Sequence, residues 1–179
     1  MKNNMACTLA TGRSLPCKSS VGGLKNIFFA DFNSLGTLTV TAGEVTAIDG
    51  SPTIFEFEVK GNSSLETAIN SSRENGTTFY ETTLNVTLTY LDKATQEELK
   101  SIAHARPHVF VEDYNGNYFL IGAVHGAEVT GGTIVTGAAM GDLSGFTLTL
   151  TAQETIPPYF VTASVVTDDV SATQIDPTP

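Results

Sequence analysis

The strongest constraint on this chain is a strict alternation of apolar and polar residues over positions 146–153. The apolar residues take every second position: Phe146, Leu148, Leu150 and Ala152. Successive side chains of a β-strand point to opposite faces of its sheet, so the pattern predicts a strand with one buried face and one hydroxyl-lined face. The intervening threonines are candidates for contact with solvent, a ligand or another copy of the chain: Thr147, Thr149 and Thr151.

Similar patterns recur along the chain and predict further strands in four segments, 24–32, 36–48, 53–60 and 77–91. Residues 108–122 predict a hairpin, because Asn115-Gly116 suits the positive φ angles of a two-residue turn. Only residues 93–105 indicate a helix, in which Thr95 and Glu98 have the spacing of a capping box.

This order of elements predicts a mainly β fold, an antiparallel β-sandwich or barrel with one α-helix at about 93–105. We expect a single domain over 21–163, preceded by an N-terminal arm, 1–20. Residues 164–179 lack apolar periodicity and predict a flexible C-terminal tail. The polar segment 61–76 is bounded by glycines and predicts an extended loop inside the domain.

The charge of the chain excludes one class of function. Nineteen acidic and nine basic residues give a net charge of -10, and binding to nucleic acid through phosphate neutralisation needs clustered Lys and Arg. An acidic surface keeps a protein soluble, and it also repels DNA that passes nearby. No apolar run reaches membrane-spanning length, so we expect no membrane anchor.

The sequence offers little for catalysis. Two histidines and two carboxylates lie close together, His104, His108, Glu112 and Asp113, but Pro107 breaks the helix that would align the imidazoles. No motif places a nucleophile beside a base, and phosphate and dinucleotide loops are absent. We therefore expect no catalytic residues, no metal site and no cofactor, and we expect that the protein is not an enzyme.

Three stretches carry a resemblance to a known family: "CTLATGRSLPCKSSVGGLKNIFFADF", "VEDYNGNYFLIG" and "GDLSGFTLTLTAQE". Together with the acidity, the strand order and the single helix, they resemble the tail tube (major tail) proteins of tailed bacteriophages. The resemblance implies a tail-tube-like fold and hexameric rings that stack into a hollow cylinder. DNA then passes through the cylinder without sequence-specific binding.

The same resemblance implies partners and sites. The protein would be part of the virion, contact other phage tail proteins, and be present in the bacterial host cytoplasm during assembly. Thr147, Thr149 and Thr151 would face the lumen or a neighbouring subunit. Segment 61–76 would reach a neighbouring subunit through five candidate interface residues: Asn62, Ser63, Glu66, Arg73 and Glu74. The alternative is another virion component, such as a capsid decoration or head-tail connector protein.

Overall fold

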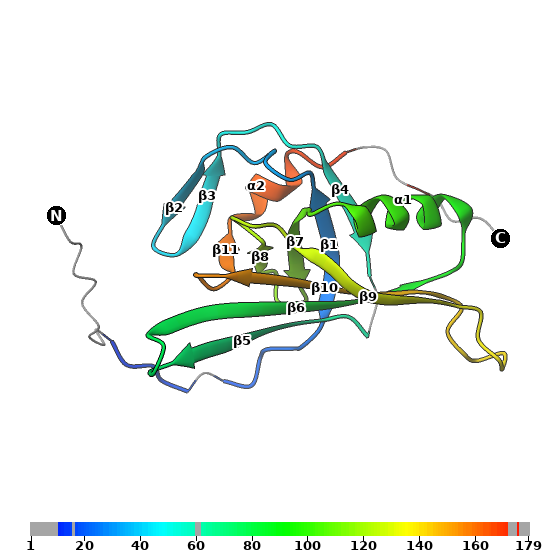
Figure 1. Cartoon of the computed structure of the whole chain (residues 1–179), viewed down its shortest axis with the longest axis horizontal. Helices are drawn as coiled ribbons and strands as arrows, with labels where there is room; N and C mark the ends of the chain where they lie inside the picture. Colours follow the sequence, from blue (N-terminus) through cyan, green and yellow to red (C-terminus); the bar gives the residue numbers. More distant parts are fainter. Residues whose placement is uncertain (1–10, 16, 60–61, 172–174, 176–179) are drawn as a thin grey trace.

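The computed structural model describes residues 11–15, 17–59, 62–171 and 175, which contain two packed β-sheets (Figure 1). The strands are β1 (Leu24–Ala30), β2 (Leu38–Thr41), β3 (Glu44–Ile48), β4 (Ile54–Glu58), β5 (Ser64–Ser72), β6 (Thr77–Thr89), β7 (His108–Asp113), β8 (Tyr118–Ile121), β9 (Glu128–Val135), β10 (Gly145–Glu154) and β11 (Tyr159–Val161). The helices are α1 (Lys93–His104) and α2 (Ala163–Thr167). The predicted mainly β, sandwich-like fold is confirmed, and the sheets do not close into a barrel.

The two sheets differ in size and order. One has seven strands in the order β2-β3-β11-β8-β7-β1-β4, and the other has four in the order β5-β6-β10-β9. Neighbouring strands are antiparallel except β11 and β3, which run parallel. In the four-stranded sheet, Phe146 of β10 lies opposite Leu88 of β6 and Ile134 of β9. The pairing with β6 is regular along the strand, whereas the pairing with β9 shifts between Thr149 and Leu150.

The first core lies between the sheets. It contains the alternate residues of strands from both layers: Ile27, Phe29, Val109, Val111 and Ile121 from the larger sheet and Leu84, Val86, Leu150 and Ala152 from the smaller one. Burying such side chains stabilises the fold by about 25 cal/mol for each Å² of apolar surface removed from water. This core fixes which face of β10 turns outward.

A second core covers the other face of the seven-stranded sheet. Phe28, Phe110 and Leu120 are buried there against α2, whose Val165 and Val166 are both buried. The backbone of Ser171 donates to the carbonyl of Ile54. The prediction of a flexible tail from residue 164 is therefore wrong for 164–171. Because both cores pack on the seven-stranded sheet, strands such as β1 are buried on both faces.

Helix α1 confirms the helix predicted over 93–105. Its N-cap is Asp92, whose carboxylate accepts from the backbone N–H of Thr95 at 2.8 Å, so Thr95 is the third helical residue and not the cap. Leu99 is buried, and Ile102 packs against the core between the sheets. The helix thereby covers one end of the sandwich (Figure 1).

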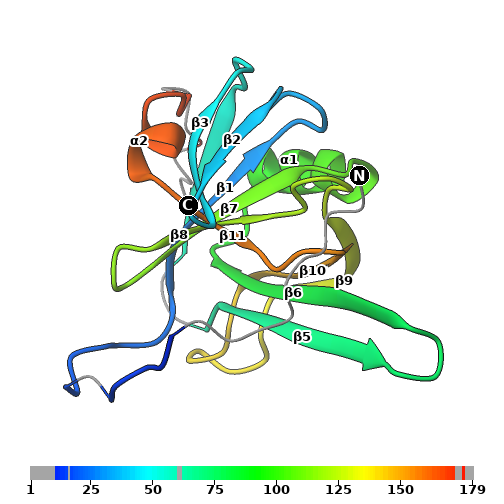
Figure 2. The same ribbon diagram turned by 90° about the vertical axis from the view of Figure 1, so that its left-hand side faces the viewer.

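Within the segment predicted as an extended loop over 61–76, residue 61 lies outside the described residues, and 64–76 form a strand and a turn. Residues 64–72 are β5, which pairs with β6 from Ser64 opposite Asn85 to Ser72 opposite Thr77. Only 73–76 make the turn. The resulting β5–β6 hairpin projects beyond the rest of the smaller sheet (Figure 2).

Two other predicted segments also differ in detail. Residues 36–48 form a hairpin instead of one strand, because Ala42 and Gly43 both have positive φ and turn the chain between β2 and β3. Of the predicted N-terminal arm, residues 1–10 and 16 lie outside the described residues. Residues 11–15 and 17–20 are exposed and belong to no helix or strand.

Candidate functional site

The outward face of the four-stranded sheet is lined by hydroxyl groups, and we call it the threonine face. It comprises Thr147, Thr149 and Thr151 of β10, Thr83, Asn85 and Thr87 of β6, Thr130 and Thr133 of β9, and Glu66 of β5. On the other face, Leu150 lies in the first core, Leu148 packs against it, and Phe146 is buried. The prediction that the three threonines of β10 share one face is thus realised in the strand pairing.

Hydrogen bonds between neighbouring strands connect the threonine face. The hydroxyls of Thr133 and Thr147 are 2.7 Å apart, and those of Thr130 and Thr151 are 3.2 Å apart. The hydroxyl of Thr149 donates to the side-chain oxygen of Asn85 at 3.0 Å. Cross-strand pairs of this kind each stabilise a sheet by about 0.2–1 kcal/mol. The face is therefore an ordered polar surface.

The charge on this face has one sign. Glu66, Glu81 and Glu128 lie in register with Thr83, Gln153 and Thr151, respectively, and the four strands contain no Lys or Arg.

The fourth carboxylate of these strands, Glu154, points inward and accepts from the backbone N–H groups of Val124 and His125, both at 2.9 Å. The outward face consequently combines neutral hydroxyls with negative charge.

Both outer strands of the smaller sheet have an unpaired edge within the described part of the chain. Strand β5 pairs only with β6, and β9 pairs only with β10. Ile69 of β5 is 70% exposed, and Phe79 of β6 is also exposed, so the projecting hairpin carries apolar side chains without cover. Edges of this kind readily pair with another chain.

The structure separates the five predicted interface residues. Glu66 lies on the threonine face, whereas Arg73 and Glu74 lie in the exposed turn of the hairpin.

Ser63 is only 5% exposed, and its hydroxyl accepts from the backbone N–H of Thr87 at 3.1 Å, so its side chain stabilises the sheet and is not a surface contact. Asn62 is exposed, and its carbonyl accepts from the hydroxyl of Thr87. The apolar hairpin residues Ile69 and Phe79 were not predicted as contacts from the sequence. The available signal was that Leu65, Thr67 and Ile69 occupy every second position, as in a strand.

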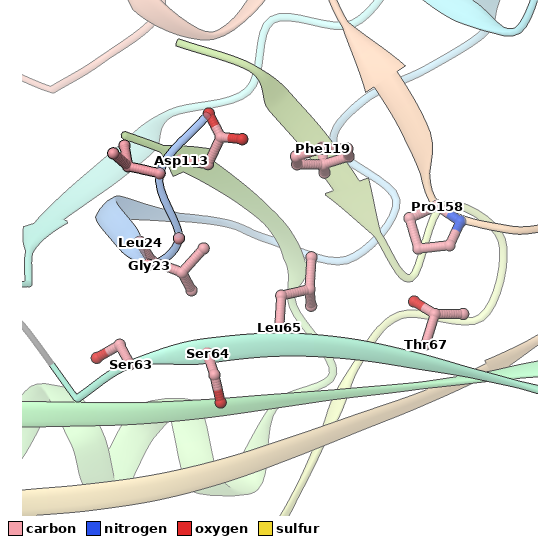
Figure 3. A pocket seen from close by; sticks show the side chains of 11 residues that line it. Gly23, Leu24, Ser63, Ser64, Leu65, Thr67, Asp113, Phe119 and Pro158 are labelled. Carbon is pink, nitrogen blue, oxygen red and sulfur yellow. The ribbon is translucent and has the colours of Figure 1, made fainter. Parts of the chain in front are cut away.

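A cavity of about 490 Å³ opens at one end of the sandwich, where the chain enters β1 (Figure 3). Its walls are mainly apolar, and Leu65, Phe119 and Pro158 point toward the opening, whereas Ser64 points away from it. The one carboxylate of its lining, Asp113, is engaged in the turn between β7 and β8. Burial acts to raise the pKa of Asp113, but hydrogen bonds from Asn117 and Asn115 hold it below its usual value. The carboxylate of Asp113 is therefore committed to the turn between β7 and β8.

The two histidines considered for a metal lie in different environments. His104 is exposed at the end of α1, where its Nδ1 is 2.7 Å from the carbonyl of Lys100. His108 is buried, and its two ring nitrogens contact the carbonyl of Gly122 and the backbone N–H of Asn33. Within the residues that the structure describes, no three His, Cys, Asp or Glu side chains gather as metal ligands would.

A separate polar cluster lies on β1, β4 and β7. The carboxylate of Glu112 is almost fully buried and accepts from Lys25 Nζ at 2.9 Å and from Asn26 Nδ2 at 2.8 Å. Burial and the neighbouring Glu58 and Glu112 raise the pKa of Glu56. Because the buried carboxylate of Glu112 has these partners, its hydrogen-bonding capacity is satisfied, and removal of a partner would leave it uncompensated.

Comparison of the chain with protein-family models, curated proteins and solved structures gives no match. Neither helix of the described residues is long and apolar enough to span a membrane.

Proposed function

We propose that this chain is a structural virion protein of a tailed phage, whose copies form hexameric rings that stack into the tail tube. The observation that carries the proposal is the threonine face. It is a hydroxyl and carboxylate surface, without a basic side chain in its strands, on a sheet whose two outer strands each have an edge that no described residue pairs with.

The directions of the strands support ring formation. Strands β5 and β9 are the outer strands of an antiparallel four-stranded sheet, so they run in opposite directions. Rotation about a ring axis keeps the direction of a strand along that axis, and β9 of one copy would meet β5 of the next in antiparallel orientation. Such pairing would give partners to the backbone groups of both edges and join the threonine faces into one lining.

The composition of the face supports passage of DNA. Protein binding to DNA draws much of its strength from Lys and Arg side chains that neutralise phosphates. Neutral hydroxyls and the carboxylates of Glu66, Glu81 and Glu128 provide no such contacts. A lumen with this lining would let DNA slide without holding it.

Negative-stain microscopy and light scattering of the purified protein test the proposal. We expect rings or tubes for the wild type and loss of assembly for Ile69→Lys, which places a charge at the exposed edge of β5. Val124→Lys is the matched control, because Val124 is an exposed valine, 56% accessible, outside the hairpin. Both substitutions should change the free energy of unfolding of the monomer by no more than about 0.5 kcal/mol.

A wild-type protein that stays monomeric at all concentrations contradicts the proposal. Small closed particles that do not stack would instead support a capsid decoration or head-tail connector protein. If Ile69→Lys and Val124→Lys assemble equally, the β5 edge is not part of the subunit interface.

A further inference from the structure

The chain contains two Asn-Gly pairs, and both lie in hairpin turns. Asn75-Gly76 stands between β5 and β6, and Asn115-Gly116 stands between β7 and β8. In such a pair the backbone nitrogen of glycine can attack the side-chain carbonyl of asparagine, since glycine has no side chain to block the approach. The two sites have the same chemistry, so their surroundings decide their reactivity.

The Asn115 site is restrained at both reacting groups. Its amide nitrogen donates to the carbonyl of Val21 at 2.8 Å and to the carboxylate of Asp113 at 3.2 Å, and its side-chain oxygen accepts from the backbone N–H of Val21 at 3.0 Å. The attacking nitrogen, on Gly116, donates to the carbonyl of Asp113 at 3.2 Å. Several hydrogen bonds must break before the ring can close.

The Asn75 site has none of these restraints. Among the described residues, neither the Asn75 side-chain amide nor the backbone N–H of Gly76 makes a hydrogen bond. The backbone N–H of Asn75 donates to the hydroxyl of Ser72 at 3.3 Å, a contact that involves neither reacting group. A Cβ placed on either Gly76 or Gly116 would meet nothing within 4 Å, so the hydrogen bonds, and not crowding at the glycine, distinguish the two sites.

We propose that Asn75 is a site of spontaneous, self-catalysed deamidation in the folded protein. The nitrogen of Gly76 forms a bond to Cγ of Asn75, its proton is lost to water, and the side-chain nitrogen leaves as ammonia. Water then opens the resulting succinimide at either carbonyl and yields aspartate or isoaspartate. No oxidant or cofactor takes part.

The products change the tip of the hairpin. Each adds a negative charge beside Glu74, and isoaspartate also lengthens the backbone of the turn by one methylene. If the projecting hairpin contacts a neighbouring copy, which rests on the proposed function, the modification marks older subunits and weakens their incorporation. The chemistry itself does not depend on that function.

The test follows deamidation at both sites by peptide mass spectrometry while the purified wild-type protein is kept at neutral pH. In the folded protein we expect Asn75 to react at least roughly tenfold faster than Asn115, which corresponds to about 1.4 kcal/mol between the two barriers. In denaturant the restraints at Asn115 are lost, and the two rates should become similar. Equal rates in the folded protein, or faster reaction at Asn115, would overturn the proposal.

A second measurement examines the consequence for assembly. Asn75→Asp introduces the new charge, and Asn75→Gln is the control that keeps the amide. We expect the aspartate variant to give a smaller assembled fraction than the glutamine variant, and equal fractions would refute the effect on incorporation. If the wild type does not assemble at all, the proposed function fails while the ratio of rates still decides whether Asn75 is the reactive site.

Discussion

Buried His108 offers a test of how this fold responds to acid. The side chain is 3% exposed, and its ring stacks on Phe32 with 5.3 Å between ring centroids. Nε2 accepts from the backbone N–H of Asn33 at 3.0 Å, and Nδ1 lies 2.6 Å from the carbonyl of Gly122. Since a carbonyl oxygen only accepts, Nδ1 carries the proton and the imidazole is neutral.

Replacement of His108 by Phe keeps an aromatic ring and removes both hydrogen bonds. Each buried polar group left without a partner costs about 1–3 kcal/mol. Gly122 is buried, so its carbonyl bears the full cost. Asn33 is exposed, so its backbone N–H can form a hydrogen bond with water instead. We therefore expect His108→Phe to lower the free energy of unfolding by about 1–3 kcal/mol, and Tm by roughly 2–12 °C for a chain of this size.

The pH dependence has a defined sign. Burial lowers the pKa of His108, and the hydrogen bond to Gly122 and the charge of Glu154 oppose that effect without cancelling it. Other charged or titratable side chains on adjoining segments are Arg106, which lies over the Phe32 ring, Asp31 and His125.

A folded state that favours the neutral ring is stabilised fully above the unfolded pKa of about 6.5, and this contribution is lost as the pH falls from that value through the lowered one.

Denaturant unfolding of wild type and His108→Phe, at about pH 7.5 and about pH 5.5, measures both effects. The difference in stability should be larger at the higher pH, because acid removes the His108 contribution from the wild type alone. His104→Phe is the control, since His104 is exposed, and it should be nearly neutral at both pH values. A variant as stable as the wild type, or an equal difference at both pH values, would refute this reasoning.

Three further substitutions test other parts of the structure. Thr149→Arg should change the free energy of unfolding of the monomer by no more than about 0.5 kcal/mol. Under the proposed function, assembled tubes of this variant should retain DNA at low salt but not at high salt, and tubes that never retain DNA would show that Thr149 does not face the lumen. Gly145→Ala should block folding or lower Tm markedly, because its Cβ would lie 2.0 Å from the carbonyl oxygen of Leu88; an unchanged melting curve would contradict this. Val166→Ala should cost about 1–3 kcal/mol by denaturant titration, since Val166 is fully buried under the larger sheet; a neutral result would mean that α2 does not hold the second core.

Long alternating patterns made much of the fold predictable from sequence. Residues 84–90 and 146–153 show strict alternation, and 84–89 and 146–153 lie in strands β6 and β10 of the smaller sheet. The hairpin at Asn115-Gly116 was predictable from its Asn-Gly pair. The two-residue turn predicted there is wrong, because residues 114–117 join β7 to β8 and, of the pair, Gly116 alone has positive φ. The outward direction of Thr147, Thr149 and Thr151 followed from the same alternation.

Other parts depend on contacts that no local pattern reveals. The apolar pattern of strand β5 is weak, since Thr67 takes an inward position and Ile69 lies beyond the core. The formation of a strand there depends on pairing with β6. Val165 and Val166 are adjacent and too few to show a period, yet both are buried by packing. The hydroxyl partners of β10 also depend on which strands become its neighbours.

The place of β11 has a consequence for synthesis of the chain. This strand lies inside the seven-stranded sheet, between β3 and β8. Its Phe160 pairs with Glu44, a residue far away along the chain. Pairing over such separations is slow, because the entropy of loop closure must be overcome first. A nascent chain that ends before β11 has two open edges in the middle of its larger sheet, on β3 and β8, and is exposed to aggregation. Emergence of β11 from the ribosome is therefore the step that completes the larger sheet.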